Sequence, residues 1–197
     1  MTFFIGRCRV TVGFFFLAVI ALLLTLDQSG AAQTGLACAA LHECAHLAAM
    51  GALGCMPREI RFTPFGIDII KPCRTDRSYG RDVLISLAGP LANLAAAAVC
   101  FAVFRLRFPM FLLANLVLFV LNIAPVEPLD GGQALQAFLC TKMEPGRAAK
   151  MVSVISFLAL VPLACAGFLI LFRSKWNFSL LFVSCYLMVL LLMKRER

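Results

Sequence analysis

Charged residues are scarce in this sequence. Only 14% of its 197 residues are Asp, Glu, Lys or Arg, whereas 62% are apolar. Soluble domains average about a quarter charged and about half apolar, so this composition excludes an ordinary water-soluble domain and predicts a protein embedded in a membrane. Because the apolar stretches use most of the chain, a second soluble domain does not fit, and we expect a single domain over residues 1–197.

Patterns that mark other classes of protein are also missing. The nine cysteines are scattered through apolar runs, as at Cys100, Cys165 and Cys185, and include no C-x-x-C pair, so no disulfide framework is expected. Most of the nine are predicted to be small buried residues. No heptad pattern, low-complexity tract or long-period repeat occurs. Lys and Arg number 18 against 10 Asp and Glu, but they form short clusters between apolar runs, which argues against a nucleic-acid partner.

Six apolar runs are each near the length that crosses about 30 Å of hydrocarbon. They cover residues 10–26, 34–53, 82–104, 109–124, 148–172 and 176–193. The first run follows Arg7 and Arg9, which leaves a cleaved signal peptide open, but its apolar core is long for one and five more runs follow, so we expect a retained helix. The predicted fold is all-α, a polytopic membrane bundle of about six transmembrane helices.

The basic clusters predict an orientation for these helices. With the N-terminus inside, 14 of the 18 Lys and Arg residues fall on the cytoplasmic side, as the positive-inside rule favours. We expect a multi-pass protein of the cell membrane with both termini in the cytoplasm. After the second run, Ile60, Phe62, Ile67 and Ile69 alternate with polar or small residues around Pro64, which predicts a short β segment.

The only two histidines, His42 and His46, lie in the second run with Glu43 between them, in the pattern H-E-x-x-H. On a helix, residues four apart project from one face about 6 Å apart along the axis, so both imidazoles can reach one metal ion. Imidazole suits Zn²⁺, and Glu43 is placed to accept a proton from a water molecule there. The alternative is a buried histidine pair bonded to neighbouring helices, with Glu43 as an ion-pair partner.

A catalytic zinc usually has three protein ligands and one open position. The candidate third ligand is Asp130, which follows a stretch where Pro125 and Pro128 interrupt the fourth run and precedes two glycines that allow close backbone approach. Two alternatives stay open: Asp130 caps a helix that starts near Gln133, or Glu127 is the ligand.

These motifs together resemble the site-2 protease family of intramembrane zinc metalloproteases. The H-E-x-x-H pattern is joined by Asn122, Pro125 and the P-L-D-G-G run at 128–132, and the A-G-P-L-A-N run at 88–93 and the T-P-F-G run at 63–66 resemble two further family segments. The similarity spans residues 34–140, the expected catalytic core. Within the family the chain is most similar to the stage IV sporulation protein FB group, which processes a membrane-associated sigma-factor precursor.

Two features depart from that group. Ile67 stands where the group often has a second glycine, and the sequence ends at Arg197 without the C-terminal nucleotide-sensing domain of many members. No regulation by ATP is therefore expected.

The resemblance implies roles for five residues. His42, His46 and Asp130 are the implied Zn²⁺ ligands, Glu43 the general base, and Asn122 a polar group near the scissile carbonyl. An equal alternative for Asn122 is a hydrogen bond to backbone groups freed by Pro125.

The implied activity is a zinc-dependent endopeptidase that cleaves a membrane-embedded or membrane-associated regulatory protein, with a membrane regulatory partner. Because a helical substrate hides its peptide bonds, we expect the 59–70 segment to bind an unwound target by β-augmentation. Alternatives from other classes are a transmembrane metal transporter, which does not need Glu43 at this spacing, and a non-catalytic membrane scaffold, which does not need the ligands and base together.

Overall fold

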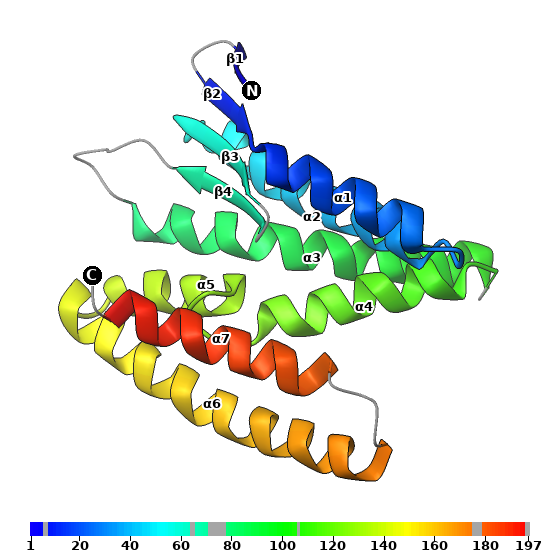
Figure 1. Ribbon diagram of the computed structural model, residues 1–197. Coiled ribbons are helices and arrows are strands. Elements are labelled where there is room, and N and C mark those ends of the chain that lie inside the picture. Colours follow the sequence, from blue (N-terminus) through cyan, green and yellow to red (C-terminus); the bar gives the residue numbers. More distant parts are fainter. Residues whose placement is uncertain (6–7, 64–65, 71–77, 106, 175–178, 196–197) are drawn as a thin grey trace.

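The computed structural model describes residues 1–5, 8–63, 66–70, 78–105, 107–174 and 179–195 (Figure 1). Most of the described chain is helical, and a small sheet stands at one side. The helices are α1 (Phe14–Leu26), α2 (Ala31–Ala52), α3 (Tyr79–Phe104), α4 (Pro109–Ile123), α5 (Asp130–Cys140), α6 (Pro145–Ser174) and α7 (Ser179–Arg195). The strands are β1 (Thr2–Ile5), β2 (Cys8–Val12), β3 (Glu59–Thr63) and β4 (Gly66–Ile70).

The four strands form one mixed sheet in the order β1-β2-β3-β4. β1 and β2 are antiparallel, as are β3 and β4, whereas β2 and β3 run parallel, with Arg9 opposite Glu59 and Val12 opposite Phe62. The β3–β4 hairpin confirms the β segment predicted after the second helix. Pro64, where a break was predicted, lies outside the described residues.

The N-terminal strands correct the predicted start of the first helix. Residues 10–12 were assigned to the first apolar run, but they belong to β2, and α1 begins at Phe14 and has only 13 residues. Val10 and Val12 are β-branched residues that favour a strand, and the Gly13 N–H that follows donates to the carbonyl of Phe62 at 3.1 Å. Pairing with β3 therefore ends the strand where the helix starts.

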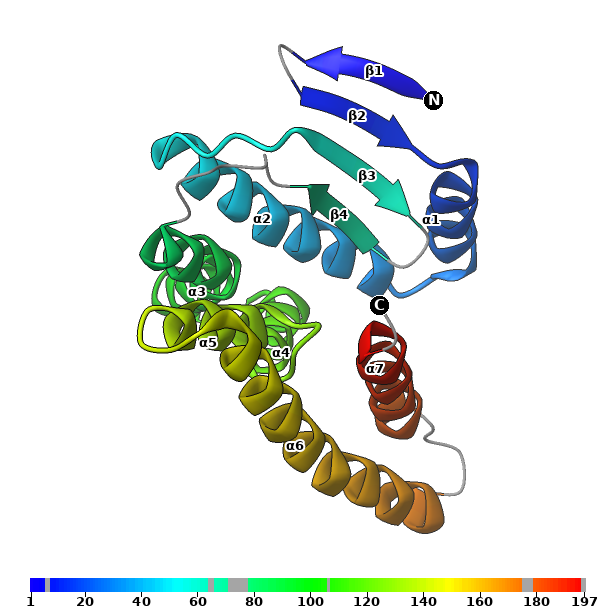
Figure 2. The same cartoon turned by 90° about the vertical axis from the view of Figure 1, so that its left-hand side faces the viewer.

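Helix α3 is the centre of the bundle. It packs against α2, α4 and α5, while α6 packs against α5 and α7. Figure 1 and the turned view in Figure 2 place the sheet on one side of these helices and α6 on the other. The sequence does not predict helix α5 as a separate helix, although it leaves open a helix that starts near Gln133.

The exterior of the bundle is apolar. Helix α1 has no buried residue and exposes large side chains such as Phe14 and Leu22. By length and hydropathy, two helices of the described chain are candidates to cross a membrane, α3 and the Pro145–Arg173 part of α6, and α1 and α4 are shorter apolar helices. An apolar outer surface of this extent indicates a membrane environment. The predicted total of six crossings stays a prediction.

The cysteines are less buried than expected. Cys38 and Cys100 are buried, but Cys165 and Cys185 are exposed on α6 and α7, so the prediction that most cysteines are buried is wrong for the described residues. A thiol behaves as a small apolar group, so it needs no burial on a helix face that meets lipid.

Candidate metal centre

The buried side chains of α2 repeat every four residues, at Cys38, His42, His46 and Met50. This spacing puts them on one face of the helix, and that face packs against α3. Only 5% of His42 and 6% of His46 is exposed. Both histidines therefore lie on one buried face of a helix, as their spacing predicted.

Asp130 approaches the two histidines from the start of α5. Its Oδ2 atom lies 2.8 Å from His42 Nε2 and 3.2 Å from His46 Nε2, and the two Nε2 atoms lie 3.2 Å apart. The side chain does not cap α5, because Leu129 is the N-cap residue and no side-chain cap bond is present. Two groups separated by more than 80 residues of sequence thus meet at one point.

The outer nitrogen of each imidazole is held by an oxygen of α3. His42 Nδ1 lies 3.0 Å from Asn93 Oδ1, and His46 Nδ1 lies 2.7 Å from the carbonyl oxygen of Ile85. These oxygens only accept hydrogen bonds, so each Nδ1 carries the proton and donates it. Each Nε2 then keeps a lone pair directed at Asp130. Metal-binding histidines commonly show this arrangement, in which one ring nitrogen donates to a protein oxygen and the other is free to bind the ion.

The donor set fits a metal ion. Tetrahedral Zn²⁺ with bonds of about 2.0–2.1 Å needs ligand atoms about 3.3 Å apart, and the three donor atoms are separated by 2.8, 3.2 and 3.2 Å. Two imidazole nitrogens and one carboxylate oxygen are also the ligand types of catalytic zinc sites. Among the described residues, His42, His46 and Asp130 form a group whose ligand atoms can hold one metal ion.

Gly89 of α3 lies directly against both imidazoles. A Cβ built at this position would lie 2.7 Å from His42 Nε2 and 2.8 Å from His42 Cε1, and it would also clash with His46 Nε2. Nonbonded carbon contacts are comfortable only from about 3.5 Å, so any side chain here would push α3 away from α2. Glycine is required at this point for the two helices to approach closely enough to form the site.

The glycine pair after Asp130 lets the preceding loop fold back on α5. A Cβ at Gly131 would clash with the carbonyl of Ile123, and one at Gly132 would clash with the carbonyl of Val126. The loop can therefore lie against the first turn of α5 only because these two side chains are absent. This close approach turns the carboxylate of Asp130 toward α2.

Helices α6 and α7 hold the same loop from the other side. The N–H of Glu127 donates to Ser156 Oγ at 2.8 Å, and that hydroxyl donates to the Val152 carbonyl at 2.7 Å. Val126 is buried in an apolar cluster with Leu160 and Leu187. The position of Asp130 thus depends on helices that contribute no ligand.

Glu43 and Asn122 lie differently with respect to the ligands. Glu43 is half-buried and interacts electrostatically with both histidines and with Asp130. Asn122 is also half-buried, and its Nδ2 donates to the Leu118 carbonyl one turn back in α4 at 3.0 Å. The structure therefore brings the carboxylate of Glu43 near the cluster, while the amide donor of Asn122 is bound within its own helix.

Sequence reasoning did not assign a role to Asn93, Ile85, Gly89 or Ser156. Asn93 and Gly89 belong to the 88–93 run already noted as a motif, so that run carried the signal. A backbone carbonyl such as that of Ile85, or one serine among many, carries no such signal.

The site thus belongs to a helical protein with an apolar exterior and a buried His-His-Asp cluster beside a carboxylate. No family model and no curated protein matches the sequence. Among solved structures, the fold is similar to that of the "Site-2 Protease from Methanocaldococcus jannaschii", with a TM-score of 0.63 over 95% of this chain and 91% of that chain and a sequence identity of 20%.

Proposed function

We propose that this protein is a zinc-dependent intramembrane endopeptidase of the site-2 protease type. The observation that carries the proposal is the convergence of His42, His46 and Asp130, with Glu43 beside them, between helices with an apolar exterior. The similar fold of an archaeal site-2 protease supports it.

Each residue has a role in the proposed mechanism. His42, His46 and Asp130 would hold Zn²⁺, with both imidazoles fixed in the required tautomer by α3. When bound, the ion would supply a Lewis acid for water and for the scissile carbonyl at this site. A carboxylate oxygen of Glu43 accepts a proton from the attacking water and returns it to the leaving amine. Asn122 contacts the substrate carbonyl when its amide exchanges the Leu118 bond for substrate.

Strand β4 is the proposed receptor for an unwound substrate segment. It stands at the end of the sheet order, and Figure 1 shows it as the strand nearest to α3. An edge strand offers unpaired backbone groups to an extended peptide, which pairs by β-augmentation. The substrate would be a membrane-embedded or membrane-associated regulatory protein such as a sigma-factor precursor, with a role in sporulation and a membrane regulatory partner.

The proposed setting is the cell membrane, which the chain crosses about six times with both termini in the cytoplasm. The distribution of Lys and Arg supports this orientation. The metal site is then reached from the cytoplasmic side.

The first test measures zinc per chain and cleavage of a membrane-tethered reporter. Wild type and Glu43→Gln are expected to hold one zinc, because Glu43 is not in the ligand group, while Asp130→Ala loses it. Of these three proteins, only wild type should cleave. Glu144→Gln, an exposed site ahead of α6, is the matched control and should retain both properties.

Two outcomes would reject the protease. If folded wild type contains no zinc, the proposed protease lacks the metal on which its mechanism depends. Zinc uptake into proteoliposomes that persists in Glu43→Gln would indicate a transporter, because transport does not need a general base.

The role of β4 has its own test. Ile67→Pro and Ile69→Pro interrupt the backbone pairing of an edge strand, so cleavage should fall while zinc content stays at the wild-type value. Ile69→Val keeps the backbone donor and is the control. Unchanged turnover in both proline variants would remove β4 from the mechanism.

A further inference from the structure

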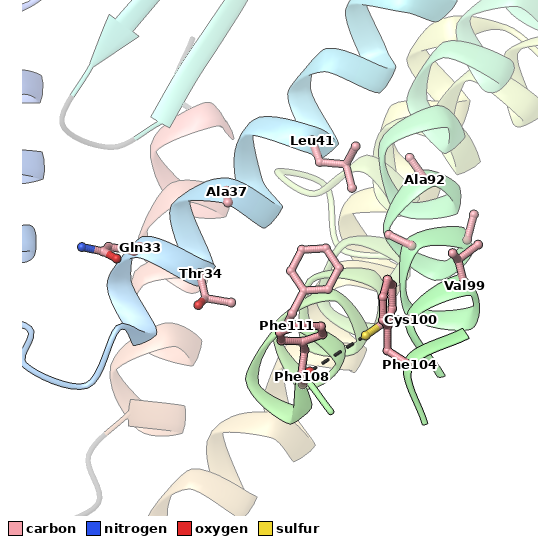
Figure 3. Close-up of a pocket in the computed structure, with 12 residues that line it drawn as sticks. Gln33, Thr34, Ala37, Leu41, Ala92, Val99, Cys100, Phe104, Phe108 and Phe111 are labelled. Carbon is pink, nitrogen blue, oxygen red and sulfur yellow. Dashed lines mark hydrogen bonds between the residues drawn. The ribbon is translucent and has the colours of Figure 1, made fainter. Parts of the chain in front are cut away.

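A cavity of about 870 Å³ opens between α2, α3 and α4 (Figure 3). Its volume lies within the range of about 300–1,000 Å³ that is usual for small-molecule sites. Its α3 wall is made of small side chains, among them Ala92, Ala95 and Ala96, and these leave the room that larger residues would fill. We call this space the lateral groove.

The walls of the lateral groove offer almost no hydrogen-bonding groups. Among the described residues that line the groove, only Gln33 and Thr34, at the start of α2, and Cys100 have polar side chains. The Thr34 hydroxyl already donates to the Gly30 carbonyl at 2.8 Å. Water needs two to four polar partners to occupy a cavity, so most of the groove does not hold it. In a bilayer, the available filling is an acyl chain.

Two arginines stand at one end of the groove. Phe104 and Phe108 line this end, with their ring centroids 5.4 Å apart. Arg105 directly follows Phe104, and Arg107 directly precedes Phe108. Both arginines are exposed, and in the described part of the chain neither forms an ion pair. They lie where the apolar helix α3 ends, the level at which headgroups meet a membrane helix.

We propose that the lateral groove binds an anionic phospholipid, with one acyl chain along the alanine wall of α3 and the phosphate between Arg105 and Arg107. Apolar contact alone does not select this occupant, because the surrounding lipid tails are as apolar as the groove. The two exposed arginines do select it, because they favour an anionic headgroup over a zwitterionic one.

The bound chain would also support the metal site. The inner end of the groove is lined by Leu41 of α2 and Ala92 of α3, which immediately precede His42 and Asn93. A chain at this depth fills space beside the α2–α3 contact that positions the imidazole. Lipid binding itself does not depend on the proposed protease activity, and it is measured without a substrate.

The test uses photolabelling of the full chain in phosphatidylcholine liposomes. The probes are a phosphatidylglycerol and a phosphatidylcholine that each carry a diazirine in one acyl chain. Labelling of wild type by the phosphatidylglycerol probe should concentrate in residues 33–41 and 92–111 and exceed labelling by the phosphatidylcholine probe by roughly 30-fold, the effect expected of two arginines near the surface.

Matched variants decide the result. Ala95→Phe fills the groove and should remove most of this labelling, whereas Ala98→Phe, also exposed on α3 but outside the groove, should not change it. Arg105→Gln combined with Arg107→Gln should abolish the preference for phosphatidylglycerol, which tests the site even if Ala95→Phe fails to fold.

Three results would overturn the proposal. These are equal labelling of wild type by both probes, full labelling of folded Ala95→Phe, and exclusion of both probes by a polypeptide that crosslinks in the groove. Zinc content, measured in the same samples, reports separately on the metal site.

Discussion

Replacement of Gly89 by alanine adds one methyl group at the point where α3 meets both imidazoles. That methyl would lie 2.7 Å from His42 Nε2 and also clash with His46 Nε2. Because carbon contacts are comfortable only from about 3.5 Å, α3 must move by about 1 Å relative to α2. The imidazoles and their Asn93 and Ile85 partners sit on opposite sides of that contact.

The expected loss of zinc affinity follows from this displacement. Ligand distances in a zinc site tolerate deviations of only about 0.2 Å, and overpacking of a buried contact typically costs about 1–3 kcal/mol. If this strain falls on the zinc-bound state, the Kd for zinc should rise about 5- to 150-fold.

The assay is zinc competition against a chelator of known affinity, with thermal unfolding measured on the same preparations. Gly80→Ala is the matched control, because it makes the same change in the same helix and nothing lies within 4 Å of the added methyl. A folded Gly89→Ala protein that binds zinc as tightly as Gly80→Ala would refute the argument that close approach at Gly89 builds the site.

Three further predictions follow from contacts around the ligands. Asn93→Ala removes the acceptor of His42 Nδ1 and should weaken zinc binding about 10- to 100-fold, while Asn93→Asp keeps an acceptor and should restore it; equal weakening in both variants would contradict this role. Ser156→Ala leaves a buried loop N–H without its acceptor, so the free energy of unfolding should fall by about 1–3 kcal/mol, and Ser156→Thr should recover it in thermal unfolding. A hydrogen bond from the Ser29 hydroxyl, together with backbone N–H groups at the start of α2, holds the pKa of Asp27 below its ordinary value of 3.8. The stability that this carboxylate adds is therefore present above pH 3.8 and lost below it, so between pH 5 and 3, about one unit either side of that value, the Tm of wild type should fall more than that of Asp27→Asn; parallel curves would show that the bonds add nothing.

Local patterns predicted the ligand helix and the β3–β4 hairpin. The spacing of His42 and His46 predicts that both side chains lie on one helix face, because residues four apart share a face in any helix. In the same way, the alternation of Ile60 and Phe62 with polar residues predicts a strand from local sequence alone. Asp130 was selected from the proline and glycine residues around it, whose backbone restrictions are also local.

Long-range contacts account for what the sequence did not predict. Val10 and Val12 fit the start of an apolar helix as well as a strand, and only pairing with β3, 50 residues later, decides between them. Likewise, Gly89 is identifiable as a motif residue, but its position against the imidazoles depends on how α2 and α3 pack. No local sequence pattern predicts that Ser156 accepts a hydrogen bond from the loop before Asp130.

The parallel pairing of β2 with β3 constrains how the chain crosses a membrane. Arg9 to Val12 pair along Glu59 to Phe62, so both strands lie on one side of any bilayer that the helices enter. The chain between them must then cross an even number of times, although α1 has 13 residues and, at about 20 Å, is shorter than about 30 Å of hydrocarbon. Whichever compartment contains Met1 also contains the β3–β4 hairpin, and a tag on the first residue would report the side from which a substrate reaches β4.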